Sequence, residues 1–289
     1  MRSVCLLANA GAGGGRAADV VEAVERRLRE HGCAVRRRTA GSADEATQLT
    51  RGIAGEADVL AVVGGDGTVH SALPAVAGTA TALGLIPAGS GNDLAAALGV
   101  PTDPLAAADL VATGNVRSVD LAQAGDRWWA TVLCAGFDSA VAARANRMRW
   151  PAGHRRYDMA LLAELARLRP HRFTLTLDGN AVPVEATLVA VGNTPQYGGG
   201  MRICPDAVVD DGLLDVTVVG RVSRRELLRV APRLRTGDHL DHPAVSRHRV
   251  SALRLDAPGV TAYADGEPVG ALPLDLVCRP GMLRVIAPS

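Results

Sequence analysis

The chain has 289 residues, which is enough for two domains or one large domain with a sizeable core. Its hydrophobic content of 48% and charged content of 21% are those of a globular protein. A formal net charge of +1 and an aromatic content of 3% argue against nucleic acid as a partner. The sequence contains arginine but no lysine, so enzymes that need a catalytic or phosphate-binding lysine are excluded as well.

The first part of the chain alternates short apolar runs with helical stretches. The pattern predicts strands at 3–8, 33–39, 58–63 and 82–86, and helices at 16–30, 43–53, 67–77, 91–98 and about 104–112. Alternation of this kind indicates a parallel sheet that is covered by helices on both faces.

From Val116 onward the pattern changes to short β-rich runs. Strands are predicted at 116–121, 127–134, 172–178, 182–192, 213–219, 249–256, 260–264, 273–278 and 282–286, with helical inserts near 138–147, 155–168 and 223–235. Asp178-Gly179-Asn180 is a hairpin signal between two of these strands. We therefore expect a two-lobed α/β protein, with a parallel α/β nucleotide-binding domain at 1–117 and a β-rich sandwich domain at 118–289.

A glycine-rich turn, Gly64-Gly65-Asp66-Gly67-Thr68, follows the third predicted strand and opens a helix. Glycines at such a turn let backbone N–H groups approach a phosphate, and a side chain there would block the approach or conflict with a positive φ. Asp66 would repel phosphate by itself, so it fits a partner of Mg²⁺ or an acceptor of the attacking hydroxyl's proton. The alternative is a plain turn in which Asp66 caps the helix.

Two further turns follow other strands of the predicted sheet. Gly89-Ser90-Gly91-Asn92-Asp93 comes after the fourth strand, and a glycine-rich run over 9–16 comes after the first. The carboxyl ends of parallel strands meet at one edge, where open α/β sheets bind ligands. Three phosphate-compatible loops at one edge indicate a nucleotide site.

With these motifs the chain resembles the diacylglycerol kinase catalytic domain family of bacterial lipid kinases, which is related to sphingosine and ceramide kinases. The resemblance rests on Gly64 to Thr68, on Gly89 to Asp93 and on Tyr263-Ala264-Asp265-Gly266-Glu267-Pro268, and it includes the segments 134–138 and 210–215. One departure is Ala10, where the family usually has proline. The resemblance implies transfer of the γ-phosphate of ATP to a lipid primary hydroxyl, with diacylglycerol the leading substrate and phosphatidic acid the product.

The family also implies roles for individual residues. The nucleotide would be held by Asn9, Gly11, Gly13, Thr39, Gly64, Gly65, Asp66, Gly67, Thr68, Ser90, Gly91 and Asn92. The catalytic carboxylates would be Asp66, Asp265 and Glu267, with Asp66 and Glu267 as rival candidates for the base. Taken alone, Asp265-Gly266 also fits an ordinary hairpin turn.

Mg²⁺ is the implied metal. Asp93 would be one of its partners beside the phosphates, and Asp211, with the backbone carbonyls of Val208 and Leu213, would form a further Mg²⁺ site. A solvated acidic loop is the alternative for the second site. A zinc site at His239 and His242 is conceivable, but a solvated loop after a helix is preferred because a third ligand is not evident.

Eight arginines stand against two acidic residues between 144 and 172, and Trp150 interrupts them; the arginines are 144, 147, 149, 155, 156, 167, 169 and 172. This face suits anionic lipid headgroups or is merely solvated.

The five scattered cysteines and the lack of a signal peptide or transmembrane run predict a cytoplasmic protein with reversible peripheral membrane association. A homodimer is compatible with the sequence. The rival functions are a kinase of a soluble substrate, similar to an NAD kinase, and a non-catalytic nucleotide- or lipid-binding regulator.

Overall fold

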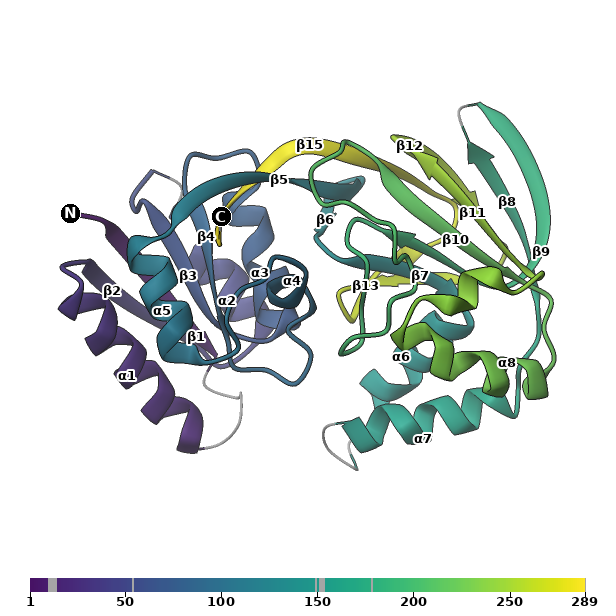
Figure 1. The fold of residues 1–289 in the computed structure, drawn as a ribbon, viewed down its shortest axis with the longest axis horizontal. Coiled ribbons are helices and arrows are strands. Elements are labelled where there is room, and N and C mark those ends of the chain that lie inside the picture. Colours follow the sequence, from purple (N-terminus) through teal and green to yellow (C-terminus); the bar gives the residue numbers. More distant parts are fainter. Residues whose placement is uncertain (10–14, 54, 149, 151–153, 178, 289) are drawn as a thin grey trace. The chain divides into compact units, whose positions relative to one another are not determined.

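The structure is a computed structural model that describes residues 1–9, 15–53, 55–148, 150, 154–177 and 179–288. The chain divides into two compact units (Figure 1). The first consists of Met1–Leu121 and Arg279–Ser289, and the second of Ala122–Cys278. Two strands, β5 (Asn115–Ala124) and β15 (Leu274–Ala287), contribute residues to both units.

The first unit is built on the predicted parallel sheet. Its strands are β1 (Ser3–Asn9), β2 (Ala34–Ala40), β3 (Val59–Gly64) and β4 (Ala82–Pro87), in the order β4–β3–β1–β2. All residues of β3 and β4 are buried, which explains their continuous apolar sequence. Ala8 lies opposite Thr39 and Val63, and Gly64 lies opposite Pro87, so the strands end at a common carboxyl edge.

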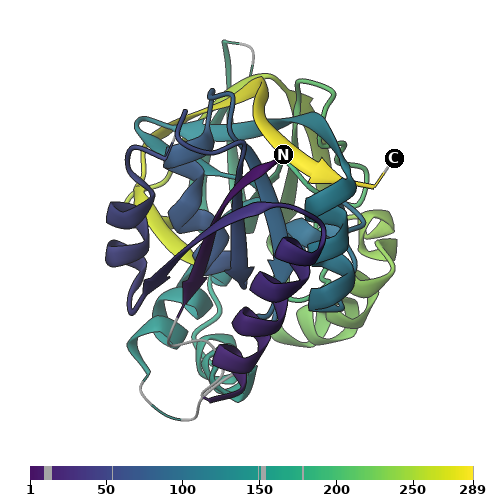
Figure 2. The same ribbon diagram turned by 90° about the vertical axis from the view of Figure 1, so that its left-hand side faces the viewer.

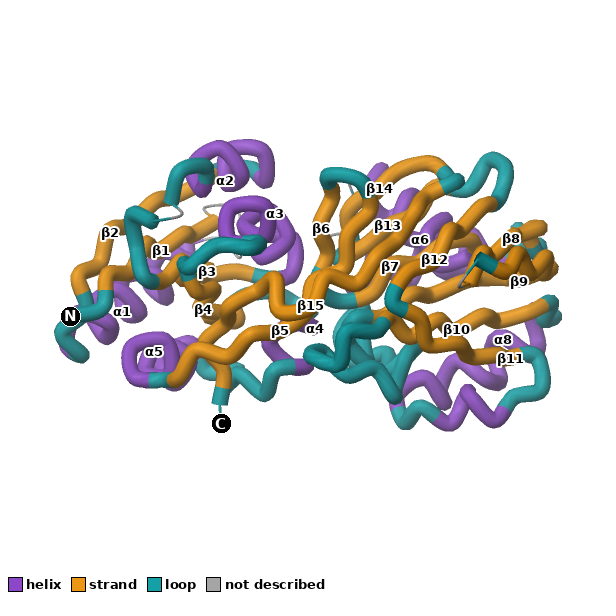
Figure 3. Tube along the Cα trace, turned by 90° about the horizontal axis from the view of Figure 1, so that it is seen from above, coloured by secondary structure: helices purple, strands orange, loops and turns teal. Residues whose placement is uncertain are grey.

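Helices cover both faces of this sheet. They are α1 (Gly15–Glu30), α2 (Ala43–Thr50), α3 (Asp66–Val76), α4 (Asp93–Ala97) and α5 (Pro104–Thr113). Figure 3 shows α2 and α3 on one side of the sheet and α1 and α5 on the other, and Figure 2 views the unit from the side of α1 and β2. The ends of these helices follow local signals: Ser42 caps α2, and Asp103 caps α5 ahead of Pro104.

The C-terminal strand β15 was predicted as two separate runs and forms a single strand. Its first half pairs with β12 (Ala252–Asp256) of the second unit, and Val285 in its second half pairs with Leu83 of β4. Gly281 takes a positive φ of 65° within the strand. The predicted domain ranges 1–117 and 118–289 did not include this return of the C-terminus to the first unit.

The second unit is an antiparallel β-structure. Its further strands are β6 (Arg127–Trp129), β7 (Val132–Gly136), β8 (His171–Leu177), β9 (Asn180–Gly192), β10 (Leu214–Gly220), β11 (Val245–Val250), β13 (Thr261–Ala264) and β14 (Glu267–Ala271). The long β9 pairs with β8 through its first half and with β7 and β10 through its second half. Trp129 and Phe173 are among the fully buried side chains of its core.

Some predicted elements of this unit have different bounds. The run 249–256 is interrupted at Ser251 and belongs to two strands, β11 and β12, while β14 was not predicted. The hairpin between β8 and β9 is present, with Leu177 opposite Asn180, although Asp178 lies outside the described residues.

The helices of the second unit are α6 (Phe137–Arg147), α7 (His154–Leu165) and α8 (Arg224–Val230). The predicted helix at 223–235 ends early: α8 gives way to a 3₁₀ turn at Ala231–Arg235, where Pro232 stands at the start. In layers, α6 packs on β7 and β13, and α7 packs on α6.

Candidate active site

The glycines of the first turn are required by close packing. A Cβ atom on Gly64 would lie 2.5 Å from the Thr68 hydroxyl oxygen, and one on Gly65 would lie 3.0 Å from the Gly89 Cα atom. Gly65 is the N-cap of α3 and has a φ of −105°, so the expected positive φ is wrong for this residue. The turn therefore needs glycine because another segment of backbone lies against it.

That other segment is the second turn. A Cβ atom on Gly89 would lie 2.4 Å from the Gly65 Cα atom, and the Ala88 N–H donates to the Gly64 carbonyl at 3.0 Å. Asn92 has a φ of 59°, and its side-chain amide both donates to the Gly89 carbonyl and accepts from the Gly89 N–H. The positive φ of this turn thus lies at Asn92, and Gly91 is outside the positive-φ range.

Asp66 joins the two turns. Its carboxylate accepts the N–H of Asp93 at 2.7 Å and, at 3.4 Å, the N–H of Leu94. The interpretation of Asp66 as the cap of its own helix is wrong, because Gly65 caps α3 and Asp66 instead satisfies the first N–H groups of α4. A Cβ atom on Gly91 would lie 2.5 Å from the other oxygen of this carboxylate.

The two turns together can bind an anion. Gly67, Gly89 and Ser90 are exposed, and the N-terminus of the eleven-residue α3 adds a partial positive charge. Asp66 and the buried Asp93 bring two carboxylates to this position. One or two carboxylates together with phosphate oxygens are the ligands that Mg²⁺ commonly takes, so the residues present fit this metal.

The remaining nucleotide candidates lie along the same carboxyl edge or outside the described residues. Asn9 ends β1, and Thr39 is an exposed residue near the end of β2. Gly11 and Gly13 lie outside the described residues, so their predicted roles stay predictions.

The carboxylate turn at 265–267 belongs to the second unit and connects β13 to β14. Asp265 and Gly266 have φ values of 51° and 85°, so the hairpin is present. The Asp265 carboxylate accepts the N–H groups of Ala130 and Thr131 at 3.1 and 3.0 Å and the Thr131 hydroxyl at 2.5 Å. Three donors fix the orientation of Asp265, which identifies it as an anchored side chain.

Glu267 is held differently. It is half-buried, and its side chain accepts no hydrogen bond from the residues that the structure describes. Asn146 of α6 donates to the Gly266 carbonyl at 3.0 Å and so supports the turn. Burial raises the pKa of Tyr157 on α7; the positive charge of Arg156 lowers it, and the negative charge of Glu267 adds to the rise.

The predicted metal loop of Val208, Asp211 and Leu213 lies at the same edge of the second unit's sheet as the turn at 265–267, but at another position along that edge. The strands β13, β7, β9 and β10 are neighbours in this order, and four of their ends lie at one edge of the sheet. These ends are the end of β13 at Ala264, the start of β7 at Val132, the end of β9 at Gly192 and the start of β10 at Leu214. Three interstrand spacings of about 4.8 Å separate β13 from β10, or roughly 14 Å. The turn of Asp265 and Glu267 and the loop of Asp211 therefore lie at different positions along this edge.

Within that loop, Asp211 accepts the Leu213 N–H at 2.9 Å and forms an ion pair with Arg249. Val208 is 45% exposed. Among the described residues, the structure brings no group of three or more His, Cys, Asp or Glu side chains into a metal-binding arrangement. The metal assignment of Val208, Asp211 and Leu213 therefore stays a prediction.

Sequence reasoning missed the residues that support Asp265. Thr131 donates to it through both its N–H and its hydroxyl, and the buried Asn193 donates through its side chain to the Ala130 carbonyl at 2.9 Å. These residues are far from Asp265 in the sequence and show no local motif.

Sequence reasoning also missed a buried pair, in which Asp138 accepts a hydrogen bond from the Tyr197 hydroxyl. Burial raises the pKa of both side chains.

The preferred interpretation of the histidine cluster as a solvated loop is wrong for His239. This side chain is 1% exposed, lies 3.2 Å from the Ile203 carbonyl, and has a pKa lowered by burial. Asp238 and Asp241 are exposed, so the cluster does not converge on one point.

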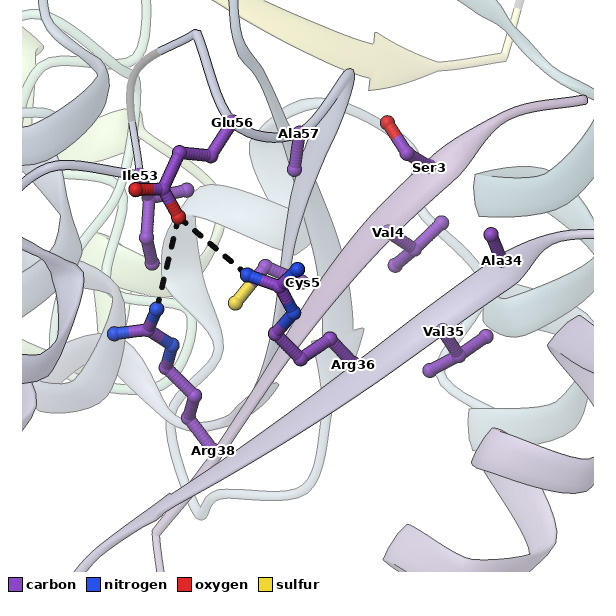
Figure 4. A pocket seen from close by; sticks show the side chains of 10 residues that line it. All are labelled: Ser3, Val4, Cys5, Ala34, Val35, Arg36, Arg38, Ile53, Glu56 and Ala57. Carbon is purple, nitrogen blue, oxygen red and sulfur yellow. Dashed lines mark ion pairs between the residues drawn. The ribbon is translucent and has the colours of Figure 1, made fainter.

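A separate pocket of about 380 Å³ lies near the amino ends of β1 and β2, away from the glycine turns (Figure 4). Arg36 and Arg38 point into it and pair with Glu56 at 3.5 and 3.8 Å. Cys5 lies beneath them, and burial raises its pKa. The pocket holds none of the predicted site residues.

The fold and the joined glycine turns define the class: a nucleotide-binding α/β unit followed by an antiparallel β unit. Residues 3–124 match the model of the diacylglycerol kinase catalytic domain, and residues 131–287 match that of the YegS C-terminal NAD kinase beta sandwich-like domain. A protein named "Diacylglycerol kinase" from Mycobacterium tuberculosis is 43% identical over 99% of this chain and 95% of its own length. The chain belongs to the diacylglycerol kinase family of lipid kinases.

Other relatives agree with this membership. A protein named "Probable lipid kinase YegS-like" from Stenotrophomonas maltophilia is 32% identical over 80% of this chain and 79% of its own length. The crystal structure of a diacylglycerol kinase from Bacillus anthracis has the same fold, with a TM-score of 0.78 at 21% identity over 99% of this chain and 97% of that one. An NAD kinase from Archaeoglobus fulgidus shares the fold more distantly, with a TM-score of 0.56 at 13% identity over 98% of this chain and 93% of that one. Membership of this kinase family implies ATP as the phosphoryl donor and a lipid as the acceptor.

Proposed function

We propose that this chain transfers the γ-phosphoryl group of ATP to the primary hydroxyl of diacylglycerol and releases phosphatidic acid. The observation that carries the proposal is the junction of the two glycine turns, where Gly65 lies against Gly89 and Asp66 accepts the Asp93 N–H. The relative named "Diacylglycerol kinase" that matches almost the whole chain supports the choice of lipid.

The first unit supplies the nucleotide site. Backbone N–H groups of the turns 64–68 and 89–92 bind phosphate oxygens, and Asn9, Gly11, Gly13 and Thr39 line the rest of the nucleotide. Asp66 and Asp93 would hold Mg²⁺, which neutralises charge on the phosphates when bound. Without lysine in the chain, backbone amides, arginine and this metal are the sources of positive charge.

The second unit supplies the proton acceptor. Glu267 is the better candidate for the base, because its carboxylate accepts no hydrogen bond from the described residues, whereas backbone donors engage an oxygen of Asp66. Asp265, held by Thr131 and Ala130, is a positioning residue that fixes the turn on which Glu267 lies.

The substrate implies where the protein works. No helix among the described residues is long and apolar enough to span a bilayer. We propose a cytoplasmic protein that associates reversibly with the membrane surface, where diacylglycerol resides, and in which the loop of Val208, Asp211 and Leu213 binds a second Mg²⁺.

An assay with γ-labelled ATP and separate acceptors tests the proposal. Label is expected in diacylglycerol dispersed in detergent, with little in NAD, sphingosine or ceramide. Label in NAD alone would establish the soluble-substrate kinase, and ATP binding without transfer to any acceptor would establish the regulator.

A further inference from the structure

The pocket near the amino ends of β1 and β2 lies between a face of the sheet and the chain that follows α2 (Figure 4). Arg36 and Arg38 stand two residues apart on β2, so their side chains leave the same face of the sheet, and Cys5 of β1 is the register partner of Arg36. Ile53 and Glu56 line the pocket from the chain that follows α2. Its volume of about 380 Å³ is that of a site for a small molecule.

Hydrogen bonds hold the charged groups of this pocket in place. Arg38 donates through Nη1 to the Leu49 carbonyl at 2.7 Å, which fixes its guanidinium group near the end of α2. The Glu56 N–H donates to the Ile53 carbonyl at 2.9 Å, which fixes the backbone that carries the Glu56 side chain. A ligand that enters the pocket therefore meets groups that are already ordered, which lowers the entropic cost of binding.

Positive charge exceeds negative charge in the pocket. Among the described residues that line it, two arginines stand against one glutamate. The Glu56 carboxylate lies 3.5 Å from Arg36 and 3.8 Å from Arg38, and both distances are longer than a charge-assisted hydrogen bond. One carboxylate at these distances does not saturate two guanidinium groups, each of which carries several N–H donors. Ion pairs between exposed side chains contribute little stability, so an incoming anion can displace Glu56.

We propose that this pocket is an anion site, which binds the phosphate group of a small ligand between Arg36 and Arg38. Arginine forks bind phosphate oxygens in pairs, and a phosphate supplies the negative charge that Glu56 alone does not provide. Burial raises the pKa of the Cys5 thiol, and the positive charges of Arg38 and Arg36 act against that rise, so their field reaches the base of the pocket. Cys5 and the buried Ile53 offer an apolar surface to the rest of the ligand.

The pocket is separate from the proposed nucleotide site. Cys5 precedes Asn9, the end of β1, by four residues, or about 13 Å of strand. Thr39 leaves β2 on the face opposite to Arg38, because neighbouring residues of a strand alternate between its two faces. The inference therefore goes beyond the proposed lipid kinase activity and does not depend on the identity of the acceptor.

Calorimetric titration of the full chain with phenyl phosphate, and separately with inorganic phosphate, tests the site. Saturating ADP and Mg²⁺ keep the nucleotide site filled during the titration. One equivalent of probe is expected to bind the ADP-filled parent protein, and the probe with the higher affinity shows whether the pocket takes an organic phosphate or the free ion. Absence of binding by either probe would overturn the site. So would probe binding that ADP abolishes, because the probe would then lie in the nucleotide site.

Substitutions in the pocket should change the affinity for the probe in opposite directions. Arg36→Gln with Arg38→Gln removes both charged donors and should weaken binding about tenfold or more. Arg36→Gln alone should also weaken it, and this variant is expected to fold because the Arg36 side chain is 70% exposed. Glu56→Gln should strengthen binding, because it removes the carboxylate that competes with the probe.

Arg254→Gln is the matched control, since Arg254 is 46% exposed and pairs with Asp275 in the second unit. It should bind the probe as the parent does. Equal affinities of the parent, Arg36→Gln and Glu56→Gln would overturn the site and leave these side chains as solvated surface.

Discussion

The carboxylate of Asp66 accepts the backbone N–H of Asp93 at 2.7 Å, so the acidic residue of one glycine turn caps the helix that begins in the other. This bond gives Asp66 a structural role beside its proposed chemical one. Substitutions that keep or remove the acceptor can separate the two roles.

Asp66→Asn should keep the fold, because an amide oxygen can still accept the Asp93 N–H, and should lower turnover by about a hundredfold or more through loss of a metal partner. Asp66→Ala should also lose about 1 kcal/mol of stability, as expected for removal of a helix cap. Steady-state kinetics and thermal unfolding measure the two effects. Near-parental turnover in a folded Asp66→Asn protein would contradict the proposed role.

Gly91→Val should abolish ATP binding rather than slow the chemical step. Its Cβ atom would lie 2.5 Å from the Asp66 carboxylate, and the side chain would press the turn away from the phosphates. Gly65→Val should behave alike, because a Cβ atom there lies 3.0 Å from Gly89. Calorimetric titration with ATP is the measurement. Gly270→Ala is the control, since its Cβ atom would lie at an ordinary contact distance of 3.6 Å from the Leu274 side chain. Unchanged ATP affinity in a folded Gly91→Val protein would place the nucleotide elsewhere.

Glu267→Gln should leave the protein folded and lower kcat by about a hundredfold or more, with little change in ATP affinity, because it removes the proposed base. Thr131→Val removes the hydroxyl donor to Asp265 and should cost about 1 kcal/mol of stability with a smaller loss of kcat. Measuring both variants ranks the two carboxylates. A larger kcat loss for Thr131→Val than for Glu267→Gln would make Asp265 the reacting group.

The elements near the glycine turns were predictable because their signals are local. A buried strand, two glycines and a helix follow one another within a few residues of Gly64, and the same order recurs at Gly89. Parallel strands then bring the turns to one edge, so their proximity also follows from the sequence. The bond from Asp66 to Asp93 does not, because it depends on the orientation of a side chain across that edge.

The supports of Asp265 could not be predicted in this way. Thr131 precedes it by 134 residues and lies on the other side of a β pairing that only the folded sheet defines. The strand β15 is divided in the prediction because Pro280-Gly281 reads as a break, yet Gly281 takes a positive φ and donates its N–H to the Asp120 carboxylate at 2.8 Å, and the strand continues. The burial of His239 likewise arises from packing against Ile203 rather than from any pattern around the histidine.

The buried pair of Asp138 and Tyr197 predicts a pH dependence of stability. Burial raises the pKa of the Asp138 carboxyl group, so folding favours its protonated form, although the hydrogen bond from Tyr197 acts in the opposite direction. The contribution of this group to stability is then fully present below its unfolded pKa of about 4 and is lost as the pH rises through its folded value.

Asp138→Asn carries a neutral amide whose oxygen can accept the Tyr197 hydroxyl at every pH. At pH 7 the variant should therefore unfold at a higher temperature than the parent, and the difference should shrink as the pH falls toward about 4. Tyr197→Phe should do the reverse at pH 7, because it leaves a buried carboxylate without its donor. Thermal unfolding between pH 4 and pH 8 measures both effects. The contrary outcome is an Asp138→Asn protein that is less stable than the parent at pH 7 and has an unchanged dependence on pH. An ionised Asp138 would then stabilise the folded state, and burial would not be the dominant influence on the pKa of this carboxyl group.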